Sequence, residues 1–154
     1  MADKKPSQMM ASVRTSGTKP ELLVRKVLLA EGYRYRLGEN YRKLGSKLPG
    51  KPDIVLPGRK AVIFVHGCFW HRHDCHLFVW PKTRTKFWET KLNGNHERDA
   101  KQQSALLAEG WRVAVVWECA LKGSKKQEEF ELAAELTSWI ERLDWPRLEI
   151  YGLK

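Results

Sequence analysis

The stretch PDIVLPGRKAVIFVH, residues 52–66, decides the fold. Its two apolar runs, 53–56 and 61–65, are rich in β-branched residues, and the Pro57-Gly58 pair between them is typical of a turn. The stretch therefore predicts a β-hairpin with a buried second strand. A third core strand is expected at 111–117, where Val and Trp residues alternate onto one face.

Helical patterns lie before and after these strands. The other expected elements are a helix that begins with the capping box Thr18-Lys19-Pro20-Glu21 and ends before Gly32, a half-exposed strand at 33–37, helices at 85–92 and 95–109 separated by a break at Asn93-Gly94, and an amphipathic helix at 127–143. This order indicates one α/β or α+β domain, and 154 residues fit a single domain. Residues 1–15 are expected to form a flexible basic arm.

The charge of the chain favours a polyanionic partner. It has 28 Lys and Arg residues against 18 Asp and Glu residues, which leaves a net charge of +10. Nucleic acid is the favoured partner and an acidic membrane surface the second, while charge that only keeps the protein soluble is the plain alternative. No apolar run is long enough to span a membrane, and the N-terminus lacks the apolar core of a secretion signal. We therefore expect neither a membrane protein nor a secreted one.

Histidine and cysteine gather in one short segment. Four of the five histidines and two of the three cysteines lie within residues 66–76. Cys68, His73 and Cys75, joined by Cys119, would make the three-thiolate, one-imidazole set of a closed structural zinc site. Cys119 would be close to the others if strand 111–117 lies beside strand 61–65. The alternative is that the cysteines are buried and inert.

Asp53 and the remaining histidines are candidates for catalysis. A carboxylate at the start of a strand can hold Mg²⁺, which prefers hard oxygen ligands; alternatively, Asp53 only belongs to a turn. His66 and His71 are left free by the zinc set, and a histidine oriented by a carboxylate is a common general base. Asp99 would orient His71, or else it is a solvated helix residue.

Aromatic residues flank the His/Cys segment. Phe69-Trp70 and Phe87-Trp88 lie in basic sequence and could stack on bases or wedge into a base step. The alternative for Trp70 and Trp88 is core packing. Trp111, Trp117 and Trp139 are expected in the core.

Several blocks of this sequence closely resemble the very short patch repair DNA mismatch endonucleases. They are LPGKPD (48–53), VIFVHGCFWH (62–71), TRTKFW (83–88), NHERD (95–99), GWR (110–112) and VWECA (116–120). The resemblance covers about residues 8–142, and the run His66-Gly67-Cys68-Phe69-Trp70-His71 is its most specific part.

The resemblance implies an α/β fold related to type II restriction endonucleases, with a central mixed β-sheet flanked by helices in residues 16–154. It implies Mg²⁺-dependent nicking of one strand of duplex DNA, 5′ to the thymine of a T:G mismatch that arises by deamination of 5-methylcytosine. We further expect a monomer in the bacterial cytoplasm, with mismatch-repair proteins as candidate partners.

The resemblance also implies roles for individual residues. Asp53 and the backbone carbonyl of Val65 become Mg²⁺ ligands, His71 the base-like residue held by Asp99, and His66 and Glu21 the supporting groups. The structural zinc is held by Cys68, His73, Cys75 and Cys119. The wedge that enters the duplex is Phe69, Trp70 and Trp88, and the mismatch contacts are Met10, Lys91 and Asn95.

Three points bear on this assignment. Restriction-like nucleases carry a second acidic residue and a lysine on the strand after the first aspartate, and Phe64-Val65-His66 offers neither. Catalysis would then depend on His71 and on phosphate oxygens that complete the metal shell. Val65 stands where this family usually has a threonine. A metal contact through the backbone carbonyl tolerates this replacement, because it does not involve the side chain. The capping box explains the position of Glu21 equally well as a catalytic role does.

Two other classes of function were weighed against a nuclease. The alternative is a non-catalytic, zinc-stabilised DNA-binding module in which Asp53 is a turn residue. A zinc hydrolase or deaminase is disfavoured, because four protein ligands leave zinc no open position and the deaminase pattern H-x-E…P-C-x-x-C is absent.

Overall fold

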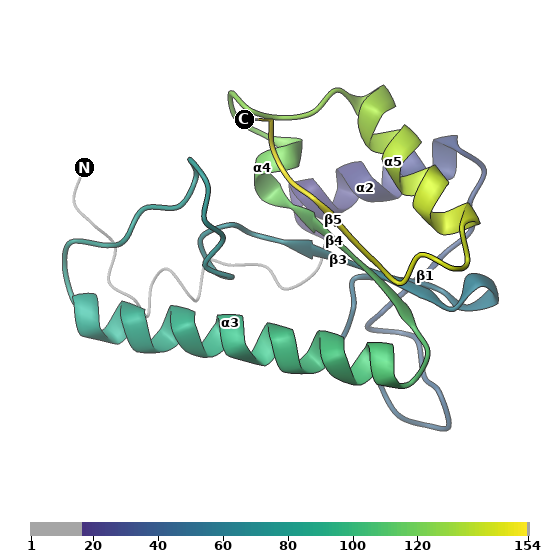
Figure 1. Cartoon of the computed structure of the whole chain (residues 1–154), viewed down its shortest axis with the longest axis horizontal. Coiled ribbons are helices and arrows are strands. Elements are labelled where there is room, and N and C mark those ends of the chain that lie inside the picture. Colours follow the sequence, from purple (N-terminus) through teal and green to yellow (C-terminus); the bar gives the residue numbers. More distant parts are fainter. Residues whose placement is uncertain (1–16, 154) are drawn as a thin grey trace.

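Five strands form one mixed β-sheet with the spatial order β1-β2-β3-β4-β5 (Figure 1). This computed structural model describes residues 17–153. The strands are β1 (Arg36–Leu37), β2 (Ile54–Leu56), β3 (Ala61–His66), β4 (Arg112–Trp117) and β5 (Arg147–Ile150). β1, β2 and β3 pair antiparallel, whereas β3, β4 and β5 run parallel. The predicted hairpin, the third core strand beside it, and the mixed sheet in a single domain are confirmed.

Helices cover both faces of the sheet. α2 (Lys19–Ala30) and α5 (Glu129–Glu141) lie over one face, and α3 (Thr85–Ala108) crosses the other (Figure 1). The short helices η1 (Pro57–Arg59) and α4 (Glu118–Leu121) follow β2 and β4. None of the helices in residues 17–153 combines the length and apolar composition needed to cross a membrane.

Alternate residues of the strands enter two separate cores. Ile63 and Ala114 pack with α2 and α5, whereas Val62, Phe64 and Val115 pack on the α3 side. Because both faces are covered, the central strands are apolar at nearly every position, as parallel sheets require.

The first helix begins and ends as predicted. The Thr18 hydroxyl accepts the Glu21 amide at 3.4 Å. The Glu21 carboxylate reaches back to the Gly17 amide at 3.0 Å, one residue before the expected N-cap amide. Gly32 has a φ of +86°, and the Gly32 and Tyr33 amides donate to Leu29 and Leu28 in a Schellman motif.

The predicted break in the long helix is wrong, because α3 continues through Asn93-Gly94. The side chains that suggested a break bond to the preceding loop instead: Asn93 Oδ1 accepts from Arg72, and Asn95 Nδ2 donates to the Trp70 carbonyl at 2.9 Å. Asn95 is therefore not an N-cap. Gly94 costs only about 1 kcal/mol relative to alanine, which a long packed helix tolerates.

Other boundaries differ in extent. The strand expected at 33–37 is reduced to Arg36–Leu37, and the last helix is Glu129–Glu141 rather than 127–143. β5 was not anticipated, because four residues with two apolar positions carry little signal alone. Its pairing with β4 supplies the order that its sequence lacks.

Candidate active site and metal centre

A cleft of about 690 Å³ opens where the N-terminus of α2, the start of β2 and the end of β3 meet. Its walls include the predicted site residues Glu21, Asp53, Val65, His66, Trp70 and His71. The antiparallel pairing of β2 with β3 brings Asp53, which directly precedes β2, beside Val65 near the end of β3. Five predicted catalytic or Mg²⁺-binding residues, separated along the chain, therefore share one cavity.

Two carboxyl groups occupy the bottom of this cleft. Asp53 Oδ2 accepts the Val65 amide at 2.7 Å. Glu21 is only 2% exposed and pairs with Arg25 one turn along α2. Burial raises the pKa of Asp53 well above its ordinary value; the neighbouring Glu21 carboxyl raises it further, while the Val65 amide and Arg25 act in the opposite direction.

This acid pair fits a divalent cation. Two carboxylates beside one arginine leave an excess of negative charge in a buried place, and carboxylate oxygens are the donors that Mg²⁺ prefers. Val65 contacts Asp53 through its amide; a metal contact by the Val65 carbonyl stays a prediction. The sequence reasoning did not identify Arg25, although its position four residues after Glu21 is the spacing of a helical ion pair.

Two stacked histidines line the same cleft. The rings of His66 and His71 are parallel, with centroids 3.7 Å apart. His66 is 5% exposed, and burial, followed by the charge of His71, holds the pKa of His66 well below its ordinary value. His71 Nδ1 lies 2.5 Å from Asp99 Oδ2. Because a carboxylate accepts this hydrogen bond, the Nδ1 atom carries the proton and the Nε2 atom is free to act as a base.

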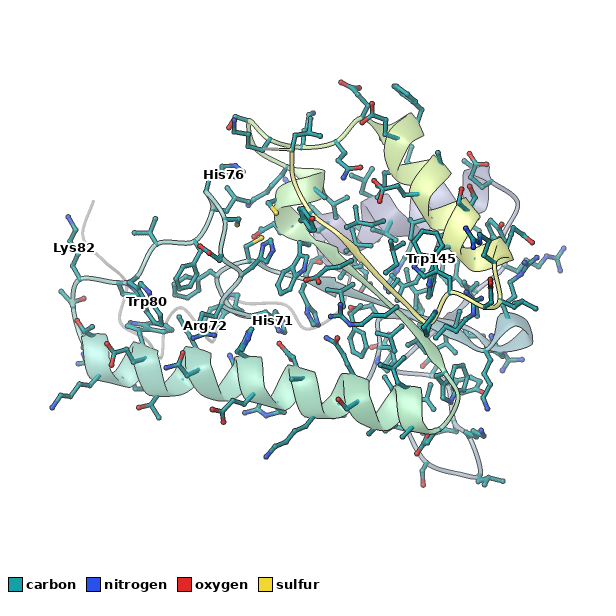
Figure 2. The ribbon with its side chains drawn as sticks, viewed as in Figure 1. His71, Arg72, His76, Trp80, Lys82 and Trp145 are labelled. Carbon is teal, nitrogen blue, oxygen red and sulfur yellow. The ribbon has the colours of Figure 1, made fainter. Side chains whose placement is uncertain are left out.

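Helix α3 holds the loop that carries His71. Asn95 and Asp99 lie one turn apart on the same face, and they bond to Trp70 and His71 respectively. Arg72 donates to Asn93 one further residue along the loop. Figure 2 shows His71 and Arg72 lying along this helix. The predicted His71–Asp99 pair is therefore present in the described structure.

The four predicted zinc ligands converge. Their ligand atoms, from Cys68, His73, Cys75 and Cys119, all lie within 4.8 Å of one another. His66 pairs with Trp117 in the β3–β4 register, so residues 68 and 119, each two positions further on, meet at the same edge. The amides of Cys119 and Gly152 donate to the sulfurs of Cys68 and Cys119.

The chemistry of this cluster fits zinc. Burial raises the pKa of both the Cys68 and Cys119 thiols, which favours their protonated forms unless a divalent cation binds and converts them to thiolates. Three sulfurs and one imidazole nitrogen are the donor set of closed structural zinc sites. His76, a neighbour in sequence, is outside this ligand group.

The predicted wedge residues form one aromatic cluster. The ring of Phe69 lies edge-on to Trp70 and Trp88, with centroids 5.2 and 5.3 Å away. Trp88 is only 2% exposed, whereas Phe69 and Trp70 are half-buried. Of the predicted mismatch contacts, Lys91 and Asn95 lie on α3, and Met10 lies outside the described residues.

The cleft also contains basic residues that the sequence reasoning did not assign. Lys47 and Lys51 lie on the loop before Asp53 and line the same cavity. The block LPGKPD contains Lys51, so the sequence held a signal for it. Lys47 directly precedes the buried Leu48, in a loop that packs against Phe64 and Gln102 at Gly50.

Comparisons with known proteins agree with this arrangement. The family model described as DNA mismatch endonuclease Vsr matches residues 1–77. The type II nicking enzyme V.XorIIP of Xanthomonas oryzae pv. oryzae is 51% identical over 73% of this chain and 79% of its own length. The DNA mismatch endonuclease Vsr of Escherichia coli K12 is 42% identical over 87% of this chain and 82% of its own. The type II nicking enzyme V.NmeAIP of Neisseria meningitidis is 47% identical over 77% and 80%.

These similarities extend over most of the chain. The chain therefore belongs to the Vsr family of DNA mismatch endonucleases.

Proposed function

We propose that this protein is a Mg²⁺-dependent endonuclease that nicks one strand of duplex DNA 5′ to the thymine of a T:G mismatch. Such mismatches arise when 5-methylcytosine is deaminated. The observation that carries the proposal is the His71–Asp99 hydrogen bond at 2.5 Å in a cleft that also contains the buried acids Glu21 and Asp53. Family membership and the net charge of +10 support a DNA substrate.

Each group in the cleft has a distinct task in this reaction. Asp53, Glu21 and the Val65 carbonyl would hold Mg²⁺, which would stabilise negative charge on the scissile phosphate as a Lewis acid. His71 Nε2 takes the proton of the attacking water. Asp99 keeps the His71 ring in the required tautomer and stabilises the imidazolium that forms. His66, stacked on the His71 ring, limits its rotation.

Lys47 and Lys51 favour a polyanion in a cleft that otherwise contains carboxylates. Both line the cavity wall beside Asp53. A phosphodiester gains negative charge in the transition state of hydrolysis, and ammonium groups within reach stabilise it. The pair thus supplies part of the positive charge that the strand Phe64-Val65-His66 does not.

The zinc cluster has a structural role in this proposal. Cys68 and His73 enclose the segment that carries Phe69, Trp70 and His71, so a bound zinc ion restrains the base and the wedge together. Phe69 and Trp70, backed by Trp88, enter the duplex beside the mismatch. Lys91, Asn95 and Met10 contact the mismatched bases. We propose that a monomer suffices in the bacterial cytoplasm, with mismatch-repair proteins as partners.

The test is a nicking assay on end-labelled duplexes that differ only in a T:G mismatch or a matched pair. Purified protein should nick the T:G duplex with Mg²⁺ and leave it intact when Mg²⁺ is omitted. Asp53→Ala should bind the T:G duplex but not nick it, since the substitution removes a metal ligand and no DNA contact. Binding without nicking by the wild-type protein would favour the non-catalytic DNA-binding module, and equal nicking of both duplexes would refute the mismatch specificity.

A further inference from the structure

Large apolar side chains are exposed where the loop after β3 joins α3. Val79 is 69% exposed, Trp80 is 40% exposed and Phe87 is 41% exposed. Exposed apolar side chains that gather in one place mark an interaction site more often than scattered ones do. None of these three residues belongs to the cleft, the zinc cluster or the predicted wedge.

The exposed residues are continuous with that wedge. Trp80 lies edge-on to Phe78, with ring centroids 5.0 Å apart, and Phe78 stacks on Phe69 at 6.1 Å. Phe87 packs edge-on against the buried Trp88 at 5.2 Å, and Trp88 in turn contacts Phe69. Figure 2 shows His71, Arg72 and Trp80 in a row beside α3. The aromatic surface therefore extends from the cleft toward the start of this helix.

The charge of the segment that carries these residues indicates which kind of partner can bind it. Residues 77–88, LFVWPKTRTKFW, contain three basic residues and no acidic one. The basic residues are Lys82, Arg84 and Lys86, and all three are exposed. By contrast, the exposed Phe130 on α5 is surrounded in sequence by Glu128, Glu129 and Glu131. Glu89 follows residues 77–88 directly, but the basic residues outnumber it, and a predominantly basic apolar surface is complementary to nucleic acid.

We propose that Val79, Trp80 and Phe87 form a second apolar contact with duplex DNA, on the flank of the mismatch rather than at it. This proposal rests on the proposed function, because it takes the same duplex as its ligand. Trp80 and Phe87 are each linked to Phe69 through one intervening ring, with centroid separations of 5.0–6.1 Å per contact. At 3.4 Å per base pair, this places the contact within about three base pairs of the wedge. The contact therefore lies on the near flank of the mismatch and contributes to the choice of flanking sequence.

A contact on the flank differs from the wedge in one measurable respect. Insertion of the wedge is more favourable at a mismatch, because opening a mismatched base step costs less free energy than opening a paired one. Trp80 touches paired DNA in either case, so its loss should weaken binding to T:G and matched duplexes by the same factor. We expect about tenfold for Trp80→Ala, from the usual contribution of one aromatic side chain that contacts bases.

The experiment measures dissociation constants by fluorescence anisotropy without Mg²⁺, so that no nicking occurs. A T:G duplex and a matched duplex of the same sequence are compared, both with flanks of ten base pairs. Phe130→Ala is the control variant, since Phe130 is an exposed aromatic residue on the far face. On both duplexes Trp80→Ala should bind about tenfold more weakly, and Phe130→Ala should bind like the wild-type protein.

A second variant guards against a folding defect. Val79→Glu places a negative charge on a side chain that is already solvated, and it should weaken binding to both duplexes at an unchanged melting temperature. Wild-type affinity of either correctly folded variant for the two duplexes would overturn the proposal, as would a loss confined to the T:G duplex, which would assign these residues to the wedge. Failure of the wild-type protein to bind any duplex would instead refute the proposed function.

Discussion

Replacing Asp53 by asparagine should abolish nicking and at the same time stabilise the folded protein. The amide keeps the size of the carboxylate and an oxygen that can accept the Val65 amide, so the hydrogen bond at 2.7 Å is retained. The change removes one of two buried carboxylates that share a single arginine. Loss of a metal ligand should lower the nicking rate by more than about 100-fold. Even residues that only hydrogen-bond to a metal ligand typically cost about 10–100-fold in metal affinity or activity when they are replaced.

The size of the stabilisation follows from the charges around Asp53. Two unit charges about 4 Å apart repel by about 4 kcal/mol at an effective dielectric constant of about 20. Arg25 offsets part of this repulsion, and the raised pKa of Asp53 lets a proton relieve another part. We therefore expect a gain of about 1–2 kcal/mol in the free energy of unfolding, or a rise in Tm of about 2–8 °C.

The pH dependence has a definite sign. A carboxyl whose pKa is raised on folding favours the folded state at low pH and loses that contribution as pH rises through the folded pKa. The difference in stability between Asp53→Asn and the wild type should thus be near zero at about pH 4 and grow toward pH 8. Mg²⁺ should raise the Tm of the wild-type protein but not that of the variant.

The assay is thermal unfolding of the zinc-loaded protein across this pH range, with and without Mg²⁺. Glu39→Gln is the matched control, because Glu39 also lines the cleft but is exposed. It should change neither the Tm nor the response to Mg²⁺. An Asp53→Asn protein that melts at or below the wild-type temperature at pH 8 would refute the idea that the acid pair is strained without a cation.

Four further outcomes are expected. Asp99→Asn should slow single-turnover nicking by about 10²–10⁴-fold while binding to T:G DNA stays unchanged, because the base loses its orienting partner; a wild-type rate would exclude the pair from catalysis. Cys119→Ser should release zinc and lower the Tm, and metal analysis that still finds one zinc per chain would contradict the four-ligand set. Trp70→Ala should weaken binding to T:G DNA by about 1–3 kcal/mol and to matched DNA by less, whereas equal losses with a lowered Tm would identify a core residue. Because burial lowers the pKa of His66, its contribution to stability is present above about pH 6.5 and is lost as pH falls below it; urea unfolding should show a shallower pH slope in His66→Phe, and an unchanged slope would argue against the buried neutral ring.

The sequence by itself determined the elements whose signals are local. The Thr18 cap and the Gly32 terminus define α2 because capping depends on residues within one turn. The hairpin of β2 and β3 followed from two apolar runs around Pro57-Gly58. The prediction that Cys68, His73, Cys75 and Cys119 come together followed from residue type, and their ligand atoms do converge.

Tertiary structure decided the features that depend on competing partners. The side chains of Asn93 and Asn95 favour a break only when nothing else binds them; the loop from Trp70 to Arg72 does bind them, and α3 runs on. β5 acquires its order from the edge of β4 rather than from its own four residues. Local propensity is a weak preference, and tertiary hydrogen bonds and burial override it.

The residues of the cleft also differ in how far the sequence alone identified them. Asp53, His71 and Asp99 were predictable as chemistry-bearing residues, but Glu21 looked equally like a helix cap. It serves as a cap and also lies against Asp53, because the N-terminus of α2 is packed over the end of β3. Whether Trp70 and Trp88 pack in the core was likewise open, and the fold buries Trp88 while Trp70 stays half-buried. The sequence supplied the reactive groups, and packing between distant segments decided which of them are buried together and which remain exposed.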